Sequence, residues 1–118
     1  MVETPKRVQL SRRKGWRMPA NTVKVTRGTG IWGNPFIVNP NVKPGSKSGA
    51  FYICVPTVED AVACYREMLA SDGASAEQLR SRLPELRGKN LACWCRLDAV
   101  CHADVLLELA NPPAEGQP

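Results

Sequence analysis

The sequence predicts an α/β domain of small, Rossmann-like, three-layer architecture with a short, mostly parallel sheet. Runs typical of buried or half-buried strands come at residues 22–27, 36–38, 51–55 and 90–95. Amphipathic helical patterns alternate with the later runs, which favours parallel strands joined by helices. The length of 118 residues suits one compact domain. We assign residues 1–111 to a single domain.

The first half of the chain shows strand signals broken by glycine and proline. The stretch 6–17 is dense in charge, with Val8 and Leu10 between the charges, and fits a short edge strand followed by an arm. Residues 22–27 alternate and are β-branched, as in a strand. Gly28, Gly30, Gly33 and Pro35 then interrupt regular structure before the apolar run 36–38. Residues 39–49 are turn-forming, and we expect a surface loop there.

The second half alternates strands and helices. The apolar run 51–55 predicts a buried strand, which Pro56 ends. Thr57 and Asp60 resemble a capping box, and apolar residues at helical spacing follow up to Leu69.

A shorter helix is expected next, with Ser75 and Gln78 as a second capping box and Pro84 as its break. Residues 90–95 form the last predicted strand and 103–110 the last helix. Pro112 and Pro113 stop that helix, and residues 112–118 have the composition of a disordered tail.

Composition excludes several classes of protein. No apolar run approaches the roughly 20 residues that a membrane span needs, so we expect no membrane partner. The first seven residues lack the apolar centre of a secretory signal. Five cysteines without a secretory context argue against a disulfide framework. We expect a cytoplasmic protein whose cysteines are buried, ligating or reactive.

Charge is unevenly distributed along the chain. The net charge is +5, but residues 1–48 carry +9 and residues 49–118 carry −4. We take residues 1–20 as a basic N-terminal arm that binds nucleic acid weakly, in a salt-sensitive way, through counterion release. The alternative is a merely solvated basic surface. The arm residues expected to bind nucleic acid are Arg12, Arg13, Lys14 and Arg17.

The most informative segment is 93–104, with the sequence CWCRLDAVCHAD. It holds three of the five cysteines and the single histidine, between a predicted strand and a predicted helix. Ligands of open α/β sheets bind at such strand ends. Side chains two apart in a strand share a face, so Cys93 and Cys95 point the same way and Trp94 the other.

Three interpretations of this segment remain open. In the first, Cys95, Cys101 and His102 bind a metal, with Cys93 as the fourth ligand. The spacing differs from that of known zinc motifs, so we expect no metal site, no tightly bound zinc and no cofactor. In the second, Cys101 and His102 lie at a helix N-terminus, which attracts anions and lowers a thiol pKa.

In that second interpretation Cys101, His102 and Asp104 are the candidate catalytic residues. His102 moves a proton, and Asp104 orients it or caps the helix. In the third interpretation the cysteines are small buried apolar residues and His102 caps the helix. Cys54 and Cys64 are expected in the core.

The loop 27–36, with the sequence RGTGIWGNPF, is a second candidate site. Trp32 offers a stacking face for a base, Arg27 a fork for phosphate, and glycines such as Gly33 permit close backbone approach. The alternative is a tight turn pinned by a buried tryptophan. We expect Trp32, Gly33 and Asn34 to line one pocket with Cys95, Cys101 and His102, as ligand-binding residues.

Three segments together resemble a family of small uncharacterised phage and bacterial proteins, catalogued as a domain of unknown function. They are 5–10 with Gly15-Trp16-Arg17, 25–27 with the WGNPF segment, and 86–95 through Cys101-His102-Ala103-Asp104-Val105-Leu106. The resemblance covers nearly the whole chain. It implies a class and a phage setting, hence a host-cell cytoplasm, without naming a reaction.

Two functions follow as expectations. The first is a domain that binds or processes a nucleotide or nucleic acid at a pocket formed by the WGNPF loop and the CWC…CHAD junction. The second is a non-enzymatic module that binds nucleic acid or a host protein, with structural or zinc-bound cysteines. Spacing fixes no nucleophile–base pair, so the sequence does not decide whether the protein is an enzyme.

Overall fold

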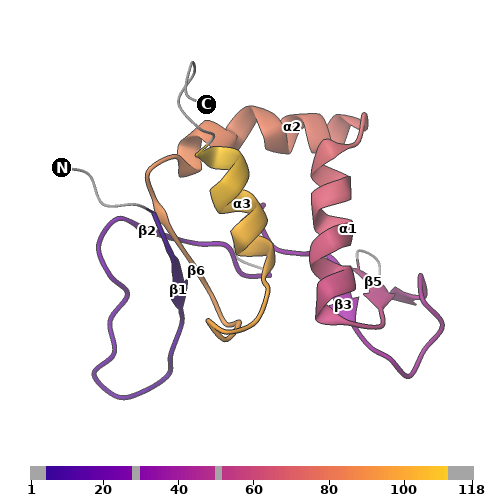
Figure 1. The fold of residues 1–118 in the computed structure, drawn as a ribbon, viewed down its shortest axis with the longest axis horizontal. Helices are drawn as coiled ribbons and strands as arrows, with labels where there is room; N and C mark the ends of the chain where they lie inside the picture. The colour runs from indigo at the N-terminus through magenta and orange to yellow at the C-terminus, as the bar shows by residue number, and fades with distance from the viewer. Residues whose placement is uncertain (1–4, 28–29, 50–51, 112–118) are drawn as a thin grey trace.

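The computed structural model describes residues 5–27, 30–49 and 52–111. The expectations for Gly28, Phe51 and the tail 112–118 fall outside these residues. The elements (Figure 1) are β1 (Arg7–Gln9), β2 (Thr22–Lys24), β3 (Phe36–Val38), β4 (Lys47–Ser48), β5 (Tyr52–Val55), α1 (Val58–Ala70), α2 (Ala74–Arg82), the 3₁₀ helix η1 (Leu83–Leu86), β6 (Asn90–Cys93) and α3 (His102–Ala110).

The fold is a mixed α/β domain, but its strands form two short sheets where one was expected. The order is β1-β6-β2 in the first sheet and β3-β5-β4 in the second. The first is parallel throughout, and in the second β4 is antiparallel to β5. The segment between β2 and β3, which holds Gly30, Gly33 and Pro35, separates the first sheet from the second. The Rossmann-like, three-layer arrangement is not confirmed.

A long crossover loop, residues 10–21, joins β1 to β2. Both strands run parallel to β6 from opposite sides. The chain must therefore return from the end of β1 to the start of β2, and parallel crossovers need about a dozen residues or more. The predicted edge strand and basic arm are thus one strand and this loop, which projects from the sheet (Figure 1).

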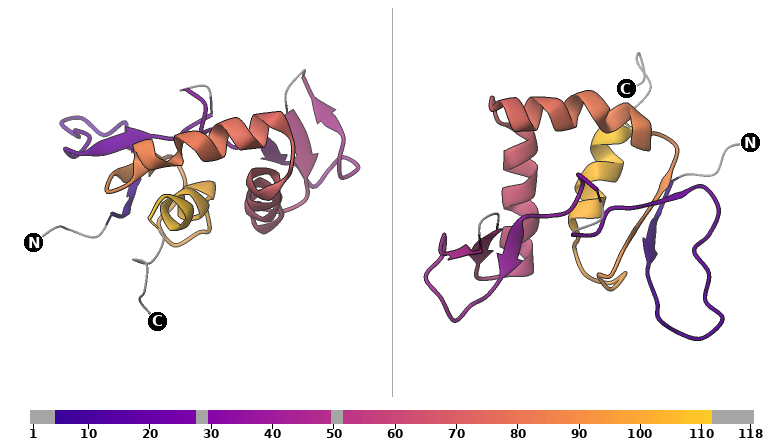
Figure 2. Two further views of the ribbon diagram at one scale, coloured as in Figure 1. Left: turned by 90° about the horizontal axis from the view of Figure 1, so that it is seen from above. Right: turned by 180° about the vertical axis from the view of Figure 1, so that it is seen from behind.

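Helices α1 and α3 lie side by side, and α2 runs across one end of the pair (Figure 1). Seen end-on in Figure 2, α1 and α3 stand on the same side of the molecule. α3 packs on β6 and η1, whereas α1 packs on β3. The apolar stripes of both helices meet in the core, where Tyr65, Leu69, Val105 and Leu106 are almost fully buried.

Helix boundaries follow the predictions with one exception. Thr57 caps α1 by accepting a hydrogen bond from the Asp60 N–H. Pro84 ends α2 in a 3₁₀ turn. The second predicted capping box is wrong, because α2 begins two residues earlier than that box requires and its N-cap is Gly73, which makes no side-chain cap. The expected loop 39–49 contains the two-residue strand β4.

None of the helices within the described residues is both long and apolar enough to cross a lipid bilayer.

Candidate functional site

A pocket of about 410 Å³ opens where the carboxyl ends of β2 and β6 meet β3, α1 and the start of α3. This volume lies within the range of small-molecule sites. One wall is apolar, and the other carries thiols and polar groups. The lining residues are Thr26, Arg27, Asn34, Phe36, Ile37, Val38, Val58, Ala61, Val62, Cys93, Trp94, Cys95, Cys101 and His102.

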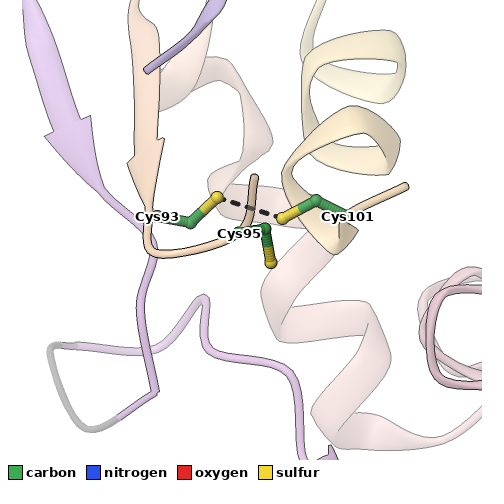
Figure 3. A group of neighbouring side chains, drawn as sticks. All are labelled: Cys93, Cys95 and Cys101. Atoms are coloured by element: carbon green, nitrogen blue, oxygen red, sulfur yellow. Dashed lines mark hydrogen bonds between the residues drawn. The ribbon is translucent and has the colours of Figure 1, made fainter. Parts of the chain in front are cut away.

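Three cysteines that line this pocket lie close together, and Figure 3 shows their side chains. Cys93 ends β6, Cys95 follows it by two residues, and Cys101 is the N-cap of α3. Their sulfur atoms all lie within 4.8 Å of one another. The Sγ atoms of Cys93 and Cys101 are 3.1 Å apart, and all three cysteines are free. Cys93 and Cys95 therefore lie together as predicted, but not by strand alternation, because β6 ends at Cys93 and Trp94 lines the same pocket.

The three thiols differ in pKa. The pKa of Cys95 lies well below the ordinary thiol value because Cys101, and then Cys93, donate hydrogen bonds to its sulfur. The pKa of Cys101 is raised, because its proton bridges to the sulfurs of Cys93 and Cys95. Cys95 is half-buried, whereas the other two are almost fully buried. The negative charge of the cluster is thus concentrated on its most accessible sulfur.

His102 is fixed by a backbone carbonyl. Its Nε2 lies 2.7 Å from the Val25 oxygen, so Nε2 carries the proton and donates it. The unprotonated Nδ1 then lies 3.6 Å from the Cys101 Sγ. Tyr65 packs edge-on against the ring, with centroids 5.1 Å apart. Burial lowers the pKa of His102, so the ring is held in its neutral form.

Two roles were predicted for Asp104. The first, orienting His102, is wrong. Among the described residues, the Asp104 carboxylate accepts hydrogen bonds from the Cys101 N–H at 3.1 Å and from Arg7 at 3.0 Å. The other predicted role, capping the helix, is observed, because Cys101 and Asp104 form a reciprocal capping box. This cap occupies N–H groups of the first turn of α3 and so weakens the expectation that they hold phosphate.

Arg7 is a residue of the site that sequence reasoning missed. Its side chain is only 8% exposed and pairs with Asp104. Its Nη2 also donates to the carbonyls of Arg96 and Leu97, at 2.9 and 2.8 Å. One guanidinium thus holds the turn between β6 and α3 against β1. In the sequence Arg7 was one charge among many, and no local signal set it apart.

The structure places Trp32 in the core, not at the pocket. Its side chain is 5% exposed, and its carbonyl accepts a hydrogen bond from the Tyr65 hydroxyl at 2.8 Å. It is therefore not available to stack a base, and the alternative of a turn pinned by a buried tryptophan is correct. Gly33 likewise serves packing, because a Cβ there would lie 2.6 Å from the Arg27 Cα.

Asn34 and Arg27 do line the pocket, but both also hold the loop together. The Asn34 amide donates to the Ala61 carbonyl, and its oxygen accepts from the Phe36 N–H. The Arg27 Nε donates to the Asn34 carbonyl at 2.8 Å, and the guanidinium lies over the Tyr52 ring. Arg27 is also exposed to solvent.

The sequence placed Trp94 on the face opposite the thiols and gave it no other role. In the structure, Trp94 is an exposed aromatic side chain of the pocket. It is 47% exposed and lines the pocket. The Arg12 guanidinium of the crossover loop lies 4.5 Å from the centroid of its ring. Arg13, Lys14 and Arg17 are also exposed on that loop. The basic segment is therefore tied to the pocket through Arg12 and Trp94.

Fold and site define a small mixed α/β protein with a thiol-lined pocket at the carboxyl edge of a parallel sheet. The chain belongs to the family described as Domain of unknown function (DUF4326), whose model matches residues 8–112. This confirms the resemblance inferred from the motifs. No curated protein and no solved structure matched the chain.

Proposed function

We propose that this protein binds a nucleotide, free or within a single-stranded nucleic acid, at the pocket between the WGNPF segment and the CWC…CHAD junction. The observation that carries the proposal is that Trp94 and Arg27 line one pocket, while Arg12 of the basic crossover loop lies against the Trp94 ring. Proteins that bind single strands combine a basic track with aromatic side chains on which bases stack.

Each part of the pocket has a role in this proposal. Trp94 stacks a base at the rim, and the apolar wall of Phe36 and Val62 covers the part of the base or sugar that enters. Arg27 faces a phosphate at the mouth. Arg12 either extends the stack or moves aside, since a guanidinium and a nucleobase compete for the same indole face. The crossover loop then follows the phosphate backbone.

A reducing compartment fits this proposal. Five free cysteines, two of them with sulfurs 3.1 Å apart, remain reduced in a cytoplasmic environment. A phage setting, implied by the motif resemblance, gives such a protein abundant nucleotides and single strands to bind.

The test is fluorescence anisotropy of a labelled ten-residue oligothymidylate, with free thymidine monophosphate as competitor. Trp94→Leu should weaken binding about fivefold or more, because stacking contributes about 1–3 kcal/mol per base. Trp94→Phe keeps an aromatic face and should retain most of the affinity. Equal affinity for Trp94→Leu and the parent protein would overturn the proposal.

Charge is tested with matched double variants. Arg13→Ser with Lys14→Ser removes two exposed charges from the crossover loop, whereas Lys43→Ser with Lys47→Ser removes two exposed charges near the second sheet. The first pair should weaken binding and reduce its salt dependence, and the second should not. No binding at low salt, or the same loss for both pairs, would contradict the proposal.

A further inference from the structure

The cluster of Cys93, Cys95 and Cys101 has a geometry that nucleotide binding does not use. Three sulfurs from the end of a strand, the turn after it and the N-cap of a helix converge within 4.8 Å (Figure 3). In a tetrahedral zinc site with Zn–S bonds of about 2.3 Å, neighbouring sulfurs are about 3.8 Å apart. The sulfurs are therefore spaced as ligands of one ion, and small side-chain rotations bring them to equal distances.

We propose that Cys93, Cys95 and Cys101 bind one Zn²⁺ as thiolates, with the fourth coordination position open to the pocket. This inference stands apart from the proposed function, because it needs no nucleotide. It replaces the expectation of no zinc. That expectation rested on a spacing unlike that of known zinc motifs, whereas the turn 94–100 brings the third sulfur back to the first two.

The surrounding backbone holds the sulfurs in place without the metal. Arg7 fixes the turn through the carbonyls of Arg96 and Leu97. The reciprocal capping box fixes Cys101 at the start of α3, and the Ala103 N–H points at its sulfur at 3.5 Å. Such outer contacts orient metal ligands. An N–H directed at a thiolate, together with the Arg7 charge, also offsets the net negative charge of three thiolates around a divalent ion.

Because the protein supplies three ligands, the fourth position of the zinc ion is left to an exchangeable ligand. Among the described residues, the group close enough to share an ion consists of these three cysteines. Closed structural zinc sites have four protein ligands, whereas sites with three keep a position for water or substrate. All three cysteines and His102 line the pocket, so a molecule held there reaches that position.

Zinc is favoured over the other thiophilic groups. Iron–sulfur clusters generally take four cysteines, and the remaining two, Cys54 in β5 and Cys64 in α1, belong to other elements. Binding releases to solvent the protons that the thiols still carry, and no electrons are transferred. Soft thiolates also suit Cu(I), so the competing metal is part of the test.

The test is metal analysis of the full chain, purified under reducing conditions, stripped with a chelator and reloaded with Zn²⁺ alone. We expect one equivalent to survive dialysis. Loading with Co²⁺ should give thiolate charge-transfer absorption and tetrahedral ligand-field bands. Zinc should protect three thiols from a thiol-specific reagent. Cu(I) retained with Zn²⁺ excluded, or no metal retained, would overturn the proposal.

Matched cysteine variants assign the site. Cys95→Ser should weaken zinc binding at least ~100-fold, since changes outside the ligand shell alone cost roughly 10–100-fold. Cys95 is the least buried of the three, so this variant disturbs the fold least. Cys64→Ser should bind as the parent protein does. If both variants keep one equivalent with unchanged affinity, or if the reduced protein re-forms a Cys93–Cys101 disulfide in place of taking up zinc, the site does not exist.

Discussion

The WGNPF segment and the CWC…CHAD junction are the two candidate sites that the sequence singles out, yet the structure uses them differently. In the first, residues 32–36, the indole is buried and both ends of the Asn34 amide bind backbone groups. In the second, residues 93–104, one indole is 47% exposed and three thiols face one another and the pocket. The groups of the first segment are used in packing, whereas those of the second line a pocket.

This difference shows that residue type alone does not distinguish a site from a scaffold. Tryptophan, asparagine and glycine can all contact ligands. In the WGNPF segment, however, each of them packs against or bonds to another part of the protein. The thiols of the junction are also partnered, by one another and, at Cys101, by the His102 Nδ1 and the Ala103 N–H. Thiols make weak hydrogen bonds but strong metal bonds, so this mutual pairing leaves most of their binding capacity unused.

Trp32→Ala should produce the largest effect on stability. Removing a buried tryptophan from the core costs about 3–5 kcal/mol in the free energy of unfolding. Urea denaturation followed by circular dichroism measures the change. A loss below about 1 kcal/mol would mean that the WGNPF segment is not the scaffold that we describe.

Arg7→Met should come second, at about 2 kcal/mol, because it leaves two backbone carbonyls and Asp104 without their charged donor. Arg17→Met, at an exposed position of the crossover loop, is the control and should change stability little. Arg7→Met should also weaken zinc binding roughly 10–100-fold by loosening the turn. Unchanged zinc affinity in the folded variant would show that Arg7 does not position the thiols.

Gly33→Ala should destabilise the fold by about 1–3 kcal/mol, because the added Cβ meets the Arg27 backbone and that backbone must move. Gly73→Ala is the matched control, since its Cβ meets no atom closer than 3.9 Å. The midpoints of urea unfolding for the two variants decide the comparison. Equal midpoints would argue against the tight packing of the WGNPF segment.

Trp94→Leu should change stability least, by less than about 1 kcal/mol. It removes an exposed ring and its stacking with Arg12, and such surface cation–π pairs contribute about 0.5–1 kcal/mol. Thermal unfolding measures the change. A loss as large as that of Trp32→Ala would place Trp94 in the core and reverse the comparison between the two segments.

The positions of the regular elements could be read from the sequence because they depend on local periodicity. The strand over 36–38 coincides with β3, and the helical spacing from Val58 to Leu69 coincides with α1 to within a residue. The start of α3 at the CHAD motif was also foreseen. Each of these depends on residues a few positions apart, which a linear pattern contains.

Only the tertiary structure decided which tryptophan is buried and whether the thiols meet. Trp32 and Trp94 look alike in sequence, but Tyr65, 33 residues away, holds Trp32 inside. The thiols converge on a turn that Arg7 secures from the opposite end of the chain, through an ion pair with Asp104 across 97 residues. The burial of Trp32 and the convergence of the thiols depend on contacts between residues far apart in the chain. A local sequence pattern does not predict such contacts.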